Sequence, residues 1–271
     1  MRITILSGSP RNKDGYSIIK EIEKVMSEIG NEEKSKKVKF EMIDISKMNV
    51  KLCTGCMQCF SRGDAFCPLS DDVRAIKQTL VESDGIILIS PVYALHVTSA
   101  MKLLIDRLSF LCHRPELIGT PILNIVTTDG GGQKPTLSYL KMISTAWGGH
   151  WIGNIDVVSP MYFSKSVYYN SKYAEKVRNK IEIYAQKLHS HALSDTNPKP
   201  TIYEVLTFHG LKSKTFMQKA DHDYWNSRGW LESDYYYPVQ VNPFMKLMGK
   251  CLDIFIQNYF RKNYLSGNVQ G

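Results

Sequence analysis

Four cysteines stand at spacings that suit a metal or redox centre. They are Cys53, Cys56, Cys59 and Cys67, and Pro68 follows the last of them. Gaps of two residues let successive thiolates converge on one small inorganic cluster, and the longer last gap lets the chain fold back to close it. The run is close to that of bacterial ferredoxins, although its final gap is longer. Two alternatives stay open, four plain thiols or a structural zinc ion, although the usual zinc spacing of two close pairs is absent.

The segment SGSPR at residues 7–11 has the composition of an anion site. Small residues let a ligand approach the backbone, and the helix expected to open at Ser17 would present unpaired N–H groups and a partial positive charge. Ser9 and Ser17 add hydroxyl donors, and Arg11 adds charge-assisted hydrogen bonds. The segment is neither a P-loop nor a GxGxxG dinucleotide motif. An ordinary strand-to-helix turn capped by serine is the alternative.

Two further loops, at residues 90–93 and 127–132, contain residues that could hold a flat ring. Pro91 and Tyr93 could contact the ring from one side. The glycine-rich turn TTDGGG could bring backbone N–H groups to the polar edge of the ring. His96 follows the first of these loops, and we expect it to be a structural or surface residue rather than one that faces substrate.

Strand and helix patterns alternate over the first two-thirds of the chain. Short apolar runs predict five strands, at residues 3–6, 38–45, 85–90, 121–127 and 150–158. Helical periodicity predicts a helix at residues 18–29, ended by Gly30, and others at 71–82, 97–111, 135–147 and 173–188. The alternation predicts an α/β fold with a doubly wound five-stranded parallel sheet and helices on both faces. In such a sheet the three loops described above lie past the carboxyl ends of the strands, where ligands bind.

Three motifs carry a resemblance to a known family: GSPR after the first strand, SPVY after the third, and SAMKLLIDRL at residues 99–108. Over roughly residues 1–190 the sequence resembles the NADPH-dependent FMN reductase branch of the flavodoxin-like superfamily. The resemblance implies FMN, with its phosphate near residues 9–18 and its isoalloxazine between residues 91–93 and 128–131. Tyr16 stands where the family more often has asparagine, so a backbone N–H is expected to serve there. The implied cofactor-binding residues are Ser9, Arg11, Tyr16, Ser17, Ile18, Pro91, Val92, Tyr93, Thr128, Asp129, Gly130 and Gly131.

The cysteine run is similar to the compact motif of the iron–sulfur flavoproteins, which belong to the same branch. Its place after the second predicted strand matches as well. This resemblance implies a [4Fe–4S] cluster on the four cysteines, passing single electrons to or from FMN.

We therefore expect a cytoplasmic FMN-dependent oxidoreductase that takes hydride from NAD(P)H, its co-substrate, and passes electrons to a small-molecule or protein acceptor. The flavin carries the chemistry, so no acid–base triad is expected. The alternative is an iron–sulfur flavoprotein that carries single electrons for a ferredoxin-like partner, because a net charge of +8 would suit an acidic partner. No nucleic-acid partner is expected, because the basic residues are spread along the chain.

The chain of 271 residues is expected to form an FMN-binding domain at residues 1–193 and an aromatic-rich, mostly helical C-terminal extension at residues 194–271. The extension could be a lid over the flavin, a cover for a partner subunit's cysteine loop, or a dimer contact or core. We expect a homodimer or a higher homo-oligomer.

Two features of the remaining sequence bear on location and burial. The terminal helical stripe at residues 244–259 lacks a basic face, so no membrane contact is expected, and we expect neither a signal peptide nor a transmembrane helix. Cys112 and Cys251 stand in apolar helical patterns and are expected to be buried.

Overall fold

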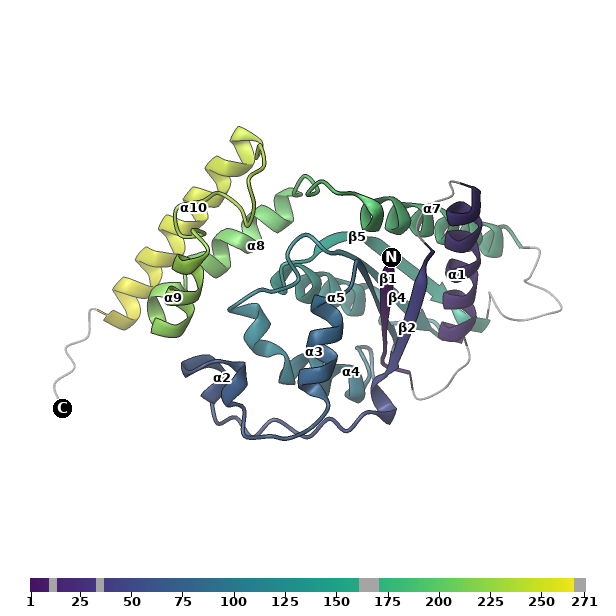
Figure 1. Ribbon diagram of the computed structural model, residues 1–271, viewed down its shortest axis with the longest axis horizontal. Coiled ribbons are helices and arrows are strands. Elements are labelled where there is room, and N and C mark those ends of the chain that lie inside the picture. Colours follow the sequence, from purple (N-terminus) through teal and green to yellow (C-terminus); the bar gives the residue numbers. More distant parts are fainter. Residues whose placement is uncertain (10–13, 33–36, 161–170, 266–271) are drawn as a thin grey trace.

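A computed structural model describes residues 1–9, 14–32, 37–160 and 171–265 of the chain (Figure 1). Arg11 lies outside the described residues. Five parallel strands form one sheet in the order β2-β1-β3-β4-β5. They are β1 (Arg2–Ser7), β2 (Lys39–Asp44), β3 (Gly85–Pro91), β4 (Pro121–Thr128) and β5 (His150–Val158). The predicted doubly wound sheet is confirmed, in the strand order of flavodoxin.

Helices cover both faces of this sheet (Figure 1). α1 (Asp14–Glu32) and α7 (Lys172–Leu193) pack together over one face, around an aliphatic core shared with β1, β3, β4 and β5. α3 (Val73–Val81), α4 (Ser99–Arg107) and α5 (Gln133–Ala146) enclose a second core on the other face. β4 is buried at every residue, which explains why the sequence shows a nearly continuous apolar run there rather than an alternation.

Three predicted helix boundaries were wrong, two in α1 and one in α4. α1 begins at Asp14 rather than Ser17, and it continues through Gly30 to Glu32. One glycine inside a helix costs only about 1 kcal/mol, which the packing against α7 outweighs. α4 ends at Arg107 instead of reaching residue 111, because Leu108 leaves the helical conformation (φ −96°, ψ 14°) and a 3₁₀ turn, η3 (Ser109–Cys112), follows.

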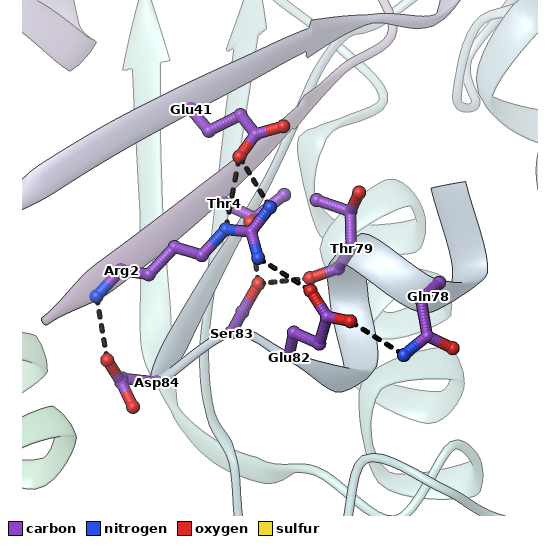
Figure 2. A network of polar contacts seen from close by, with 8 residues as sticks. All are labelled: Arg2, Thr4, Glu41, Gln78, Thr79, Glu82, Ser83 and Asp84. Carbon is purple, nitrogen blue, oxygen red and sulfur yellow. Dashed lines mark hydrogen bonds and ion pairs between the residues drawn. The ribbon is translucent and has the colours of Figure 1, made fainter. Parts of the chain in front are cut away.

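A polar network ties the strands together at their amino ends, the edge opposite to the predicted ligand loops (Figure 2). The Arg2 guanidinium donates to Glu41 of β2 at 2.8 and 3.1 Å and to Glu82 after α3 at 2.8 Å. Thr4 and Ser83 share a buried hydroxyl hydrogen bond of 2.6 Å. The network holds the edge strand β2 to the α3–β3 connection, so we assign it to stability and not to the ligand site.

The C-terminal extension has a core of its own. Its helices are α8 (Ile202–Lys212), α9 (Lys219–Ser227) and α10 (Pro243–Phe260), placed at one end of the α/β part (Figure 1). The buried residues at its centre are Val205, Phe208, Trp225, Trp230, Tyr235 and Tyr236. For these aromatic side chains the predicted role as core is confirmed, whereas the boundary at residue 193 stays a prediction.

The outer face of α10 is apolar and exposed. Phe244, Leu247, Ile254 and Phe255 are each at least 60% exposed. Cys251 is exposed in the same helix, so its predicted burial was wrong, because its apolar stripe does not face the described core. This face suits the predicted dimer contact, which stays a prediction. In the described part of the chain no helix is both long and apolar enough to cross a membrane.

Candidate functional site

The predicted ligand loops meet at the carboxyl edge of the sheet around a cavity of about 370 Å³. Eight of the twelve predicted cofactor residues line it. They are Ser9, Pro91, Val92, Tyr93, Thr128, Asp129, Gly130 and Gly131. The cavity lies past the carboxyl ends of β1 and β3. The order of the strands changes direction between these two, since β2 lies beside β1 on one side and β4 lies beside β3 on the other. Ligands of doubly wound sheets bind at such a switch point.

The three predicted residues of the first helix do not line the cavity with their side chains. Tyr16 is 41% exposed, with the Lys20 ammonium 5.2 Å from its ring centroid. Ser17 is exposed as well. Ile18 is fully buried in the core, so only its backbone faces the helix terminus. The start of α1 three residues earlier than predicted turns these side chains along the helix rather than toward the strand ends.

Sequence reasoning missed several lining residues, among them Asp14, Gly15 and Ser159. Ser159 follows β5 directly, so the rule that ligands bind past strand ends could have found it. Gly15 had a weaker signal, since a Cβ there would lie 3.1 Å from Ile89 Cδ1 and only glycine lets α1 come this close to β3. The acidic Asp14 offered no signal for an anion site.

Close packing fixes the first loop against α4. Gly8 donates its N–H to the Ile89 carbonyl at 2.9 Å, and its own carbonyl accepts from the Thr98 hydroxyl at 2.7 Å. A Cβ on Gly8 would lie 2.7 Å from Thr98 Oγ1 and 2.9 Å from Met101 Cβ. Thr98 also caps α4, because its Oγ1 accepts from the Met101 N–H. The first loop and the start of α4 therefore form one rigid wall of the cavity.

The second loop contains two consecutive non-glycine residues in the left-handed region, Ala94 (φ 47°) and Leu95 (φ 65°). Such conformations are uncommon outside glycine, and they cluster at ligand sites. A backbone bridge between Tyr93 and His96 closes the turn, with N–H to carbonyl distances of 2.9 and 3.1 Å. The His96 ring packs on Tyr139 at 4.6 Å between centroids, the contact of a structural residue.

The third loop folds back on a threonine. Thr128 Oγ1 accepts from the N–H groups of Gly130 (3.1 Å) and Gly131 (3.0 Å), and it donates to the Gly131 carbonyl at 2.6 Å. These two N–H groups were predicted to be available to a ring edge, and here the hydroxyl accepts from them instead. Gly132 (φ 76°) then starts α5.

We expect Gly132→Ala to weaken FMN binding about tenfold or more, because small displacements of a ligand wall have large effects. A Cβ at this position would lie 2.6 Å from Val92 Cγ1 and 2.8 Å from Leu95 Cα, so the second and third loops must separate. Gly229→Ala is the matched control, since Gly229 has a similar φ of 69°, its Cβ would have no neighbour within 4 Å and it lies outside the cavity. Fluorescence titration of the apoprotein with FMN measures both, and equal dissociation constants would contradict the prediction.

All four predicted cysteines line a second, smaller cavity of about 50 Å³. Cys53 and Cys56 are exposed, whereas Cys59 and Cys67 are half-buried, and none forms a disulfide. Left-handed backbone at Gly55 (φ 66°) and Met57 (φ 58°) turns the chain between them. The short helix α2 (Gln58–Ser61) and the 3₁₀ turn η2 (Asp64–Phe66) follow. The spacing thus brings the four thiols together as predicted.

The thiols differ in acidity. Burial raises the pKa of Cys59, and the neighbouring thiols Cys67, Cys53 and Cys56 raise it further through charge repulsion. The pKa of Cys56 is lowered, first by the backbone N–H of Gln58 and then by the Thr54 hydroxyl. In the described residues no group of three or more His, Cys, Asp and Glu side chains is arranged to hold a single metal ion.

Basic side chains of α3 and α4 surround the cysteine cavity. Arg74 donates to the Cys67 carbonyl at 3.3 Å, and Arg107 approaches Cys67 Sγ at 3.6 Å and the Lys51 carbonyl at 2.8 Å. Lys77 also lines the cavity. These basic side chains are already partly balanced, because Lys77 pairs with Asp64 and Glu116 and Arg107 pairs with Asp71. Sequence reasoning did not assign them, although Arg107 belongs to the SAMKLLIDRL motif.

The two cavities share no lining residue, and α4 separates them. The loop before α4 lines the first cavity, and Arg107 at the end of α4 lines the second. A helix of nine residues is about 13 Å long.

The strand order and the carboxyl-edge cavity define a flavodoxin-like protein of the flavin oxidoreductase class. A sequence model of the NADPH-dependent FMN reductase family matches residues 1–164. The chain belongs to this family.

Two curated relatives are named iron-sulfur flavoproteins. The chain is 30% identical over 239 residues to an iron-sulfur flavoprotein of Archaeoglobus fulgidus, covering 85% of this chain and 100% of that protein. It is 25% identical over 213 residues to an iron-sulfur flavoprotein of Clostridioides difficile, covering 77% and 86%. Among solved structures, an oxidoreductase from Corynebacterium diphtheriae superposes with a TM-score of 0.55 at 14% identity, covering 72% of this chain and 98% of that one, which shows the shared fold.

Proposed function

We propose that the protein is an FMN-dependent oxidoreductase that takes hydride from NAD(P)H and passes electrons to an acceptor. The observation that carries the proposal is the cavity of about 370 Å³ that the three strand-end loops line together. Cofactor sites commonly measure about 300–1,000 Å³. FMN, when bound, supplies the chemistry, because its ring accepts a hydride and releases electrons.

The residues of the chain would bind, orient and shield this cofactor. The start of α1, including the backbone of Tyr16 and Ser17, would meet the phosphate together with Ser9, because a helix N-terminus carries a partial positive charge. Pro91, Val92 and Tyr93 would form one wall for the ring, and residues 128–131 the other. Tyr93 is 41% exposed, which would leave the mouth of the cavity open to a nicotinamide or another flat acceptor.

The test is anaerobic mixing of the FMN-loaded protein with NADH or with NADPH. We expect at least one of the two nucleotides to bleach the visible flavin absorbance fully within a single turnover. Dithionite serves as control, since it reduces the flavin whatever the donor specificity. Bleaching by dithionite alone would reject the proposal.

A second candidate function is single-electron transfer for a ferredoxin-like partner, which the four-cysteine cavity favours. Cys53, Cys56, Cys59 and Cys67 would hold a [4Fe–4S] cluster, and the Arg107 guanidinium, 3.6 Å from Cys67 Sγ, could donate a hydrogen bond to one of its sulfur ligands. The cluster, when bound, would supply one-electron transfer to or from FMN. Protein purified without oxygen should then show a broad brown absorbance beneath the flavin peaks, whereas flavin peaks alone would leave the cysteines as thiols.

A further inference from the structure

The C-terminal extension contacts the cysteine loop through a buried ion pair. Arg114 lies after η3, and Asp221 lies on α9 of the extension. Arg114 Nη1 donates to Asp221 Oδ1 at 3.1 Å, and His113 Nδ1 lies 2.7 Å from Asp221 Oδ2. Arg114 is 6% exposed and Asp221 is 3% exposed. The pair is therefore withdrawn from solvent, unlike a surface salt bridge.

The same guanidinium also binds backbone carbonyls of the cysteine loop. Arg114 Nη1 donates to the Phe60 carbonyl at 3.1 Å, and Nη2 donates to the Cys59 carbonyl. Only arginine has a rigid fork that can reach a carboxylate and two carbonyls at once. Asp221, Arg114 and the backbone carbonyl of Cys59 thus form one continuous chain of contacts from α9 to a residue whose thiol lines the cysteine cavity.

The aromatic core of the extension fixes Asp221 independently of the loop. Trp225, one turn further along α9, donates Nε1–H to the His113 carbonyl at 2.7 Å. The Tyr224 hydroxyl donates to the Pro115 carbonyl at 2.6 Å. The His113 ring also meets Phe60 edge-on, 4.7 Å between centroids. The extension therefore binds the backbone of both neighbours of Arg114, His113 and Pro115.

Burial makes the ion pair between Arg114 and Asp221 necessary, because each charge needs the other as its counter-ion. A buried guanidinium needs a carboxylate, and in the described chain Asp221 is the only one within ion-pair distance of Arg114. Cys59 and Phe60 also pack against the core, whereas the preceding residues Cys53, Cys56 and Met57 are exposed. Without Asp221, Arg114 would turn toward water and release the Cys59 and Phe60 carbonyls.

We infer that Asp221 and Arg114 are positioning residues that hold Cys59 in place as a cluster ligand. The inference rests on the proposed cluster. The inference assigns the C-terminal extension a role in the cysteine site, although no described residue of the extension lines the flavin cavity or the cysteine cavity. Contacts around the ligands of a metal determine how tightly the ligands bind it. They also influence its reduction potential, because they change the charge and hydrogen bonding near the metal.

The experiment compares full-length, anaerobically reconstituted wild type with Asp221→Asn, Arg114→Gln and Asp223→Asn. Asp223 lies on the same helix, pairs with Lys219 at the surface and provides the matched change of charge. We expect Asp221→Asn and Arg114→Gln to lose iron to bipyridine about tenfold faster than wild type, and Asp223→Asn to match wild type. FMN content should stay equal in all four proteins.

The cluster potential separates positioning from general stability. Asp221→Asn removes a negative charge near the loop, so its midpoint potential should rise, whereas Arg114→Gln removes a positive charge and should lower it. Shifts of the same sign, or loss of FMN together with iron, would mean that the pair only stabilises the fold and would overturn the inference. Iron release from Asp221→Asn no faster than from Asp223→Asn would overturn it as well. A wild type that takes up no iron would instead reject the cluster, and the inference with it.

Discussion

Replacing Cys56 by serine is expected to remove the bound iron and to leave FMN in place. The Cys56 thiol is exposed, and the Gln58 N–H and the Thr54 hydroxyl lower its pKa, so it is suited to bind as a thiolate. A serine hydroxyl stays protonated and is a poor ligand for iron. We expect the iron content of anaerobically purified protein to fall about tenfold or more.

The separation of the two cavities makes this prediction selective. Cys56 lines the cysteine cavity and not the carboxyl-edge cavity, and α4 lies between them. Cys251→Ser on α10 is the control, because Cys251 is also exposed and lies outside both cavities. Iron assays and the flavin-to-protein absorbance ratio measure the outcome. Retention of iron in Cys56→Ser would refute the cluster, and loss of FMN as well would show that the two sites depend on each other.

The sheet and its loops were predictable because their signals are local. The buried run of β3 and the turn after it can be read within a few residues of sequence. The alternation of strands and helices then places residues 7–11, 90–93 and 127–132 at one edge. The four cysteines come together because their spacing alone brings them close.

The remaining features depend on contacts between residues that lie far apart in the sequence. The periodicity of apolar residues does not predict such contacts. Arg114 and Asp221 are separated by 107 positions, and Arg107 and Asp71 by 36. Cys251 sits in an apolar stripe that resembles a core pattern, but the described fold places no partner element against it. The position of Ser17 depended on where α1 begins, and helix ends are the least certain part of any pattern.

The ion pair between Arg107 and Asp71 leads to the largest expected effect on stability. The two side chains are 3% and 1% exposed, and both nitrogens of the guanidinium contact the carboxylate. Asp71 also accepts from the backbone N–H groups of Lys51 (3.0 Å) and Val73 (3.3 Å). Asp71→Asn would leave a buried guanidinium without its counter-charge, which costs about 3 kcal/mol. We expect Tm to fall by about 5 °C for a chain of this size.

The pH dependence of this effect follows from the direction of the Asp71 pKa. Burial opposes ionisation, but hydrogen bonds from Arg107 and from the Lys51 and Val73 N–H groups outweigh it and lower the pKa. A lowered pKa means that the unfolded chain binds the proton more readily, so the stabilisation is complete above the ordinary pKa of about 4. It is lost as the pH falls through the lower value of the folded state. The difference in Tm between wild type and Asp71→Asn should therefore be constant from about pH 8 to pH 5 and should narrow in more acidic buffer.

Glu28→Gln is the matched control for this variant, since its pair with Lys24 is exposed and should contribute less than about 1 kcal/mol. Scanning calorimetry across the pH range measures both variants. Equal Tm values for the two would contradict the prediction. Because Arg107 and Asp71 also hold Lys51, at the start of the cysteine loop, amide exchange at Lys51 should accelerate in Asp71→Asn and not in Glu28→Gln. The buried pair would then connect the stability of the fold to the order of the segment that carries the four thiols.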